Sequence, residues 1–208
     1  ENVRGGSGND RLLGDAENNI LTGEGGADEL LGGGGDDTLR GNAGADILDG
    51  GEGDDVLTGG AGNDIYIVSD GNDTINAGQG SDTLKVPSDY SITGIVLNSG
   101  SGDLEISLTK TTDASTHLTT ITNSVSQPVT TLIQENEDGT ETELGLRVTF
   151  NQGSGTYSAS TSSNTFVIGT IGQDSLRGGS GDDVILGNAG DDILDGGAGD
   201  DRLEGGVG

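Results

Sequence analysis

The sequence predicts an all-β fold in which short strands stack coil upon coil, with an antiparallel β insert between two stacked blocks. Three observations predict it. A nine-residue unit repeats without a break from Gly5 to Lys85 and again from Gly169 to Glu204. Each unit combines turn-forming glycines with one large apolar residue. Between the two blocks the repeat stops, and polar and apolar residues alternate instead.

The repeated unit follows the pattern G-G-x-G-x-D-x-U-x, where U is a large apolar residue. Its glycines permit the backbone conformations of tight turns. Its last three residues suit a short strand, in which alternation turns only the U residue inward. Two units therefore form one coil with two strands and two turns. The second unit, residues 14–22, departs furthest from the pattern, with Glu17 in place of Gly and Asn19 in place of Asp.

The charge of the chain is concentrated in the repeats. The net charge is -28, and 17 of the 36 acidic residues lie in residues 5–85. Such a charge disfavours nucleic acids and anionic membrane surfaces as partners and favours cations. The chain has no Cys, which excludes disulfides and thiolate metal sites. It shows no signal peptide or membrane-spanning run, and both ends lie in or beside repeats, so we expect a piece of a longer protein.

The sixth position of the unit is the candidate metal ligand. Calcium is the expected ion, because it accepts six to eight oxygen ligands, including the carbonyls that glycine turns supply. Turns two units apart stack on the same side, so the ligands pair at an interval of two units. Asp residues could instead only cap turns, but their regular recurrence favours several calcium ions. The candidate ligands are Asp10, Asn19, Asp28, Asp37, Asp46, Asp55, Asp64, Asp73, Asp82, Asp174, Asp183, Asp192 and Asp201.

Two sets of acidic or amide residues are expected to contribute less. Asn19 should give a weak site, because an amide carries no charge. Asp36 and Asp54, at the fifth position, are expected to be solvated charges.

The repeats resemble those of the RTX, or haemolysin-type, calcium-binding family. The resemblance implies a parallel β-roll in secreted bacterial proteins, which are exported unfolded by a type I secretion apparatus and fold when they meet extracellular calcium. It therefore implies a secreted or extracellular location, including attachment to the cell surface.

The insert, residues 86–163, is expected to be antiparallel β structure. Alternation predicts strands at residues 92–97, 104–108, 118–122, 129–133 and 144–150, with loops at 98–102 and 138–139. The stretch SDYSITGIVLNSGSGDLEISLT resembles the hairpin that closes the roll in haemolysin-like proteins. The insert is thus expected to cap the roll, or alternatively to bind a glycan or peptide. His117, the single histidine, is expected to be a solvated residue of a loop or strand.

The expected organisation is a first repeat block at 1–85, the insert at 86–163 and a truncated second block at 164–208. The expected function is a non-enzymatic calcium-binding module that folds at extracellular calcium. No H-E-x-x-H or G-x-S-x-G motif occurs. Two alternatives remain open. One is an adhesin segment whose insert binds a ligand, and the other is an accessory module of a secreted protease, lipase or polysaccharide-modifying enzyme with its catalytic domain elsewhere.

Overall fold

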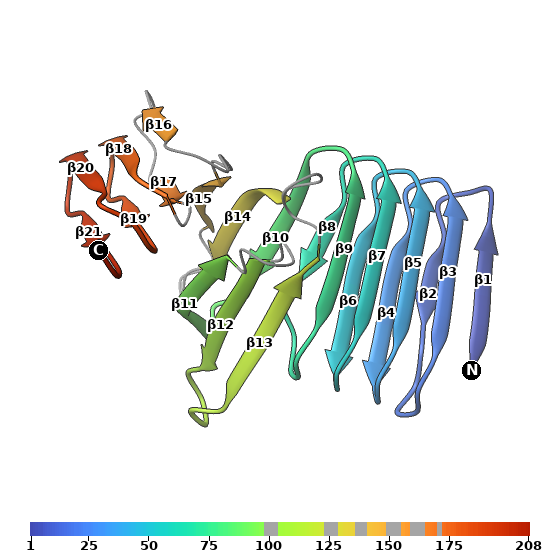
Figure 1. The fold of residues 1–208 in the computed structure, drawn as a ribbon. Coiled ribbons are helices and arrows are strands. Elements are labelled where there is room, and N and C mark those ends of the chain that lie inside the picture. The colour runs from blue at the N-terminus through green and yellow to red at the C-terminus, as the bar shows by residue number, and fades with distance from the viewer. Residues whose placement is uncertain (98–103, 123–128, 136–140, 149–154, 159–164, 170–171) are drawn as a thin grey trace. The chain divides into compact units, whose positions relative to one another are not determined.

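The computed structural model describes residues 1–97, 104–122, 129–135, 141–148, 155–158, 165–169 and 172–208. It divides into two compact units, one formed by Glu1–Val129 with Gln134–Glu141 and the other by Thr130–Ile133 with Thr142–Gly208. The described residues form strands, turns and bends (Figure 1). None of them belongs to a helix that could span a membrane.

The strands of the first repeat block are short and follow one another at the nine-residue interval. They are β1 Asn2–Gly6, β2 Arg11–Leu13, β3 Ile20–Gly25, β4 Glu29–Gly34, β5 Thr38–Ala43, β6 Ile47–Glu52, β7 Val56–Ala61, β8 Ile65–Ile67, β9 Thr74–Gln79 and β10 Asp82–Val86. Many reach six residues, because the extended backbone continues through the first three positions of the next unit. The prediction of three-residue strands left a longer turn in each unit than the structure shows.

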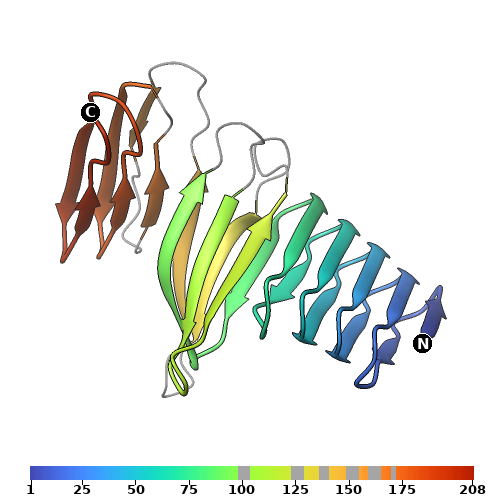
Figure 2. The ribbon, with the colours of Figure 1, turned by 60° about the horizontal axis from the view of Figure 1, so that its bottom comes forward.

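Odd and even strands of this block form two separate parallel layers. One layer has the order β1-β3-β5-β7-β9 and the other the order β2-β4-β6-β8-β10, and Figure 2 shows the layers in successive coils. Each strand pairs with the strand 18 residues away in register, as Leu39 of β5 pairs with Leu57 of β7. The predicted coil of two units is confirmed.

The core of the roll consists of one side chain from each unit. The eighth-position residues Leu12, Leu21, Leu30, Leu39, Leu48, Leu57, Tyr66, Ile75 and Leu84 are all buried. Their neighbours at positions seven and nine are only partly covered or exposed. The core is therefore two columns of large side chains, one from each layer, and all of them except Tyr66 are aliphatic.

The insert begins with an antiparallel arrangement that continues the first layer. β11 Tyr90–Leu97, β12 Leu104–Lys110 and β13 Thr116–Ile121 pair antiparallel, and β13 then pairs parallel with β9. Ile121 lies beside Ile75 in register and is fully buried. The alternating Leu104, Ile106 and Leu108 are also buried. The antiparallel insert is thus confirmed, and it extends the apolar column of the roll by one strand.

The second unit contains the second repeat block. β16 Gly155–Ser158, β18 Asp174–Ser180 and β20 Ile193–Ala198 form one parallel sheet. β15 Glu141–Val148, β17 Thr165–Ile168, β19 Val184–Leu186 and β21 Arg202–Glu204 pair in parallel as a second one. Val167, Leu176 and Ile185 form its buried core. The sequence did not predict β16, nor the parallel pairing of β15.

One further expectation for the insert can be compared with the structure, and the others fall on residues that it does not describe. β14 Val129–Glu135 coincides with a predicted strand. The predicted loops at 98–102 and 138–139, and the end of the strand at 149–150, lie outside the described residues. The three-part division at residues 85 and 163 stays a prediction.

Candidate calcium sites

The sixth-position residues form columns along the turns of each block. In the first block one column contains Asp10, Asp28, Asp46, Asp64 and Asp82, and the other contains Asn19, Asp37, Asp55 and Asp73. In the second block the pairs are Asp174 with Asp192 and Asp183 with Asp201. Most of these side chains are buried, whereas Asp10, Asp192 and Asp201 are half-buried. The structure thus brings the predicted residues together at the predicted interval of two units.

In most of these carboxylates one oxygen accepts a hydrogen bond from the neighbouring coil. The backbone N–H of Asp28 donates to Oδ1 of Asp46 at 2.8 Å, and the N–H of Asp46 donates to Oδ1 of Asp64 at 2.9 Å. The same bond recurs along both columns of the first block. It also recurs in the second block. These bonds fix the carboxylate plane, so the second oxygen of each group points in a set direction.

Within the part of the chain that the structure describes, the second carboxylate oxygen is buried without a hydrogen-bond donor at seven positions. These are the Oδ2 atoms of Asp28, Asp37, Asp46, Asp55, Asp64, Asp183 and Asp192. A buried charged oxygen without a partner is costly, and that cost favours a bound cation. Desolvation also raises the pKa of Asp55 to about 7 and that of Asp64 to about 6. Both effects have the same cause, which is negative charge held away from water.

The first-position glycine lies directly beside the Oδ2 atom of the Asp in its own unit. A Cβ added at Gly187 would lie 2.5 Å from Asp192 Oδ2 and 2.6 Å from the carbonyl oxygen of Gly205, one coil further on. At Gly41 and Gly178 the added Cβ would likewise lie within 3.0 Å of an Asp Oδ2 and of a carbonyl oxygen from the next coil. A carboxylate and a carbonyl oxygen from adjacent coils therefore face one small space that excludes a methyl group.

The oxygen-only set of donors fits calcium. Within the residues that the structure describes, no three His, Cys, Asp or Glu side chains converge on a point. Each site would therefore combine one or two carboxylates with backbone carbonyls. Calcium accepts such a set in a flexible shell, whereas magnesium demands tight octahedral geometry. Calcium bound there would supply positive charge between adjacent turns.

Glycine is needed for a different reason at the fourth position. Gly44 has a φ of 147° and Gly62 one of 138°, and a Cβ on either would collide with the carbonyl of the turn below. The second position also has positive φ but tolerates Asn42 and Glu24, at 74° and 86°. The first position does not have positive φ, which corrects the expectation that all three glycines serve tight turns.

In the degenerate second unit an amide nitrogen stands where an Asp would place its second oxygen. Nδ2 of Asn19 donates to Asp15 Oδ1 at 3.1 Å and also to the carbonyl oxygen of Glu17. Asp15 Oδ1 accepts a further bond from the Glu17 N–H at 3.0 Å, and these hydrogen bonds lower the pKa of Asp15. The turn is thus held by its own side chains, which gives a physical basis for expecting a weak site there.

The fifth position carries a second ladder that the sequence did not predict. Asp36 and Asp54 are exposed, as expected. However, Asp36 Oδ1 accepts from the Asp54 N–H at 3.1 Å, and Asp54 Oδ1 accepts from the Asn72 N–H at 2.8 Å. The fifth position therefore links coils in the direction opposite to the sixth.

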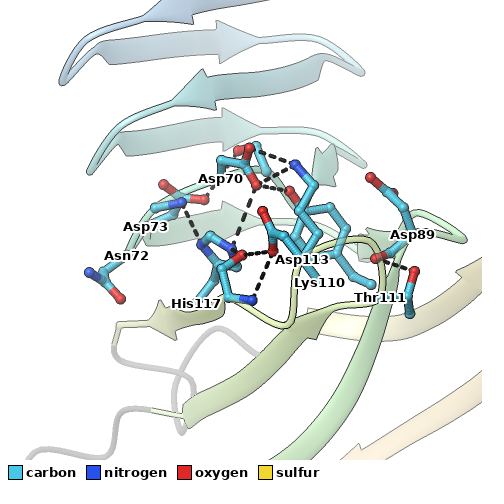
Figure 3. Close-up of polar contacts among 12 residues, drawn as sticks. Asp70, Asn72, Asp73, Asp89, Lys110, Thr111, Asp113 and His117 are labelled. Carbon is cyan, nitrogen blue, oxygen red and sulfur yellow. Dashed lines mark hydrogen bonds and ion pairs between the residues drawn. The ribbon is translucent and has the colours of Figure 1, made fainter.

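The prediction of a solvated His117 is wrong. Its side chain lies on β13 and is 12% exposed. The N–H of Gly71 donates to its Nδ1 at 2.9 Å, and its Nε2 lies 2.8 Å from Ser115 Oγ (Figure 3). Its ring packs edge-on against Tyr90, with the centroids 5.7 Å apart. No metal spacing surrounds His117 in the sequence, and Gly71 is 46 positions away, so no sequence pattern could reveal the contact between them.

Comparison with known proteins agrees with this geometry. The model of the RTX calcium-binding nonapeptide repeat matches residues 4–39, 31–66, 67–84 and 168–203, which together make up more than half of the chain. The chain has no match among curated proteins. The repeats of this family are a calcium-binding structural module. On the repeat match, the stacked coils and the two columns of acidic turns, the chain belongs to the RTX family of calcium-binding nonapeptide-repeat proteins.

Proposed function

We propose that this chain is a calcium-operated folding module of a secreted bacterial protein. The row of buried, unpartnered Asp Oδ2 atoms supports the proposal most directly. Each such oxygen opposes folding while no cation is bound, and each becomes a ligand when calcium is present. Calcium would therefore act as an integral part of the folded roll.

The apolar core is too thin to fold the repeats by itself. Each nine-residue unit buries one large side chain and orders a glycine-rich backbone, whose conformational entropy is high. Acidic groups also stack at one-coil intervals along both columns. Without calcium the repeats would stay expanded, and with calcium they would form the roll. Binding that occurs only in the folded state shifts the folding equilibrium in this way.

Such a switch suits export through a type I secretion apparatus, with folding at extracellular calcium. We propose that the chain has no catalytic role of its own, and that it supports the secretion and stability of a longer protein outside the cell or on its surface. The antiparallel insert, which extends the apolar column of the roll, supports the interpretation as a cap. No observation in the described residues favours a glycan or peptide ligand.

The test is far-ultraviolet circular dichroism of the full chain in chelator and after adding calcium or magnesium. We expect a largely coil-like spectrum in chelator, a β spectrum with calcium and little change with magnesium. Asp46→Asn removes one charge from a column. It should raise the calcium concentration at the midpoint of the folding transition, here called the calcium midpoint. Glu52→Gln removes one charge from an exposed position at the end of β6 and should leave the calcium midpoint unchanged. A β spectrum of full amplitude in chelator would contradict the proposal.

A further inference from the structure

The last coil of the first repeat block departs from the pattern of the other coils. Tyr66 stands where the other units have Leu or Ile, and Val68 and Ala77 stand where they have the first-position glycine. All three side chains are buried. The backbone nevertheless keeps its register, because β8 pairs with β6 and β10 pairs with β8. The departures therefore change what fills the turns and leave the coil itself intact.

The turn at residues 68–73 does not fit calcium as the other turns do. In regular turns the carboxylate Oδ2 lies so close to the first-position glycine that a Cβ could not be present. Here Val68 carries a Cβ. Asp73 Oδ2 accepts a hydrogen bond from the Ser69 hydroxyl at 3.2 Å, and its Oδ1 accepts from the Asp55 N–H at 3.1 Å. Protein donors thus satisfy both oxygens, whereas Asp55 Oδ2 has no donor.

A fixed positive charge lies at the same turn. Lys110 Nζ of β12 donates to both oxygens of Asp70, at 2.8 Å and 2.6 Å, and the Tyr90 hydroxyl donates to Asp70 Oδ1 (Figure 3). The Lys110 ammonium also lies 5.4 Å from the centroid of the Tyr90 ring. These donors lower the pKa of Asp70, so its carboxylate stays charged and paired.

Backbone bonds join the same turn to the insert. The Gly71 N–H donates to His117 Nδ1 at 2.9 Å, and the Thr120 N–H donates to the carbonyl oxygen of Asp73 at 2.8 Å. The Leu118 N–H donates to Asn72 Oδ1 at 3.2 Å. The turn is therefore connected to β12 and β13 by contacts in which no cation is needed.

On the opposite side of the coil, the Tyr66 hydroxyl connects two successive turns. The Tyr66 hydroxyl accepts from the Gly59 N–H at 2.9 Å and donates to the carbonyl oxygen of Ala77 at 2.9 Å. In the regular turn at Gly187, the corresponding carbonyl, that of Gly205, faces the Asp oxygen across the candidate site. A neutral hydroxyl therefore connects successive turns at residues 59 and 77, and it uses a carbonyl that elsewhere is free to face a cation.

We propose that the coil formed by residues 65–86 closes without calcium and, with the hairpin β11–β13, forms a calcium-independent end on which the other coils of the first block assemble. Asp73 is then a structural acceptor in its own turn, and Ser69 and Lys110 supply the donors and the charge that calcium supplies elsewhere. This inference rests on the proposed calcium-driven folding of the regular coils. It assigns the turn at residues 68–73 no ion.

Hydrogen exchange measured by mass spectrometry on the full chain tests this directly. In chelator we expect protection at residues 74–86 and 104–121, and free exchange at residues 20–61. In calcium all of these segments should be protected. Uniform free exchange in chelator, with order restored by calcium, would overturn the inference and leave the proposed function standing. Uniform protection in chelator would instead overturn the proposed function. In that case the number of bound calcium ions tests the turn at residues 68–73 by itself.

The ion count by native mass spectrometry provides an independent readout. The double variant Val68→Gly, Ser69→Gly restores the repeat pattern at this turn and should bind one more calcium ion than the wild-type chain. Its matched control, Ser81→Gly, changes a fifth-position residue of the next turn and should leave the count unchanged. Tyr66→Phe keeps the ring and removes the hydroxyl, so it should reduce protection of residues 74–86 in chelator. An unchanged count in the double variant would overturn the inference.

Discussion

Replacing Gly187 by Ala should abolish one calcium site while leaving the rest of the roll in place. The added Cβ would lie 2.5 Å from Asp192 Oδ2 and 2.6 Å from the carbonyl oxygen of Gly205, whereas Cβ atoms essentially never approach within 3.0 Å of another atom. The carboxylate would have to retreat by about 0.5 Å, which is large against the range of calcium–oxygen distances, about 2.3 to 2.6 Å. The methyl group would also occupy the space that the two oxygens share.

The expected loss follows from linkage between binding and folding. A ligand at 100 times its dissociation constant stabilises the folded state by about 2.7 kcal/mol, so losing one ion should cost about that much under such conditions. Native mass spectrometry should count one ion fewer, and urea unfolding of the second unit in calcium should report the loss of stability. Gly205→Ala is the matched control, because it occupies the same repeat position with no atom within 4 Å of the added Cβ. If Gly187→Ala bound as many ions as the wild type, with unchanged stability, the assignment of this space to calcium would be refuted.

Two further predictions concern protons and backbone conformation. Burial raises the pKa of Asp55 from 3.8 to about 7 and that of Asp64 to about 6, so the calcium-free roll binds more protons than the unfolded chain and its stability should fall as the pH rises through this interval. Since calcium requires ionised carboxylates, the calcium midpoint measured by circular dichroism should be higher at about pH 5.5 than at about pH 7.5, and a pH-independent midpoint would argue against buried ligands. Glu24 has a φ of 86°, so Glu24→Gly should stabilise the calcium-loaded chain by roughly 1 kcal/mol, less the small contribution of its exposed ion pair with Arg4. Chemical denaturation in saturating calcium measures this change. Asn42→Gly is a second example, since Asn42 has a φ of 74°. Destabilisation in both variants would contradict the assignment of backbone strain.

Much of the candidate site could be predicted because it repeats. An interval of nine residues with two units in each coil predicts which residues lie 18 positions apart in register, as Asp46 and Asp64 do. The same period predicts that Leu39 and Leu57 point inward. What the period does not contain is the direction of each carboxylate oxygen, which depends on the backbone N–H of the neighbouring coil. The reason for the first-position glycine was therefore not evident from the sequence.

The sequence by itself determined the coil, its apolar columns and the turns that carry acidic residues, because short-range periodicity decides all three. Apart from the weak site expected at Asn19, only the tertiary structure decided which of these turns suit calcium. At Asn19 an amide nitrogen stands where an Asp would place an oxygen toward an ion. At Asp73 that oxygen accepts from the Ser69 hydroxyl, and at Asp70 a lysine 40 residues away provides the charge. The contact between Asp70 and Lys110 depends on how the insert packs against the last coil. Packing between segments far apart in the chain leaves no periodic trace in the sequence, so the calcium-independent end of the roll could be inferred only from the folded molecule.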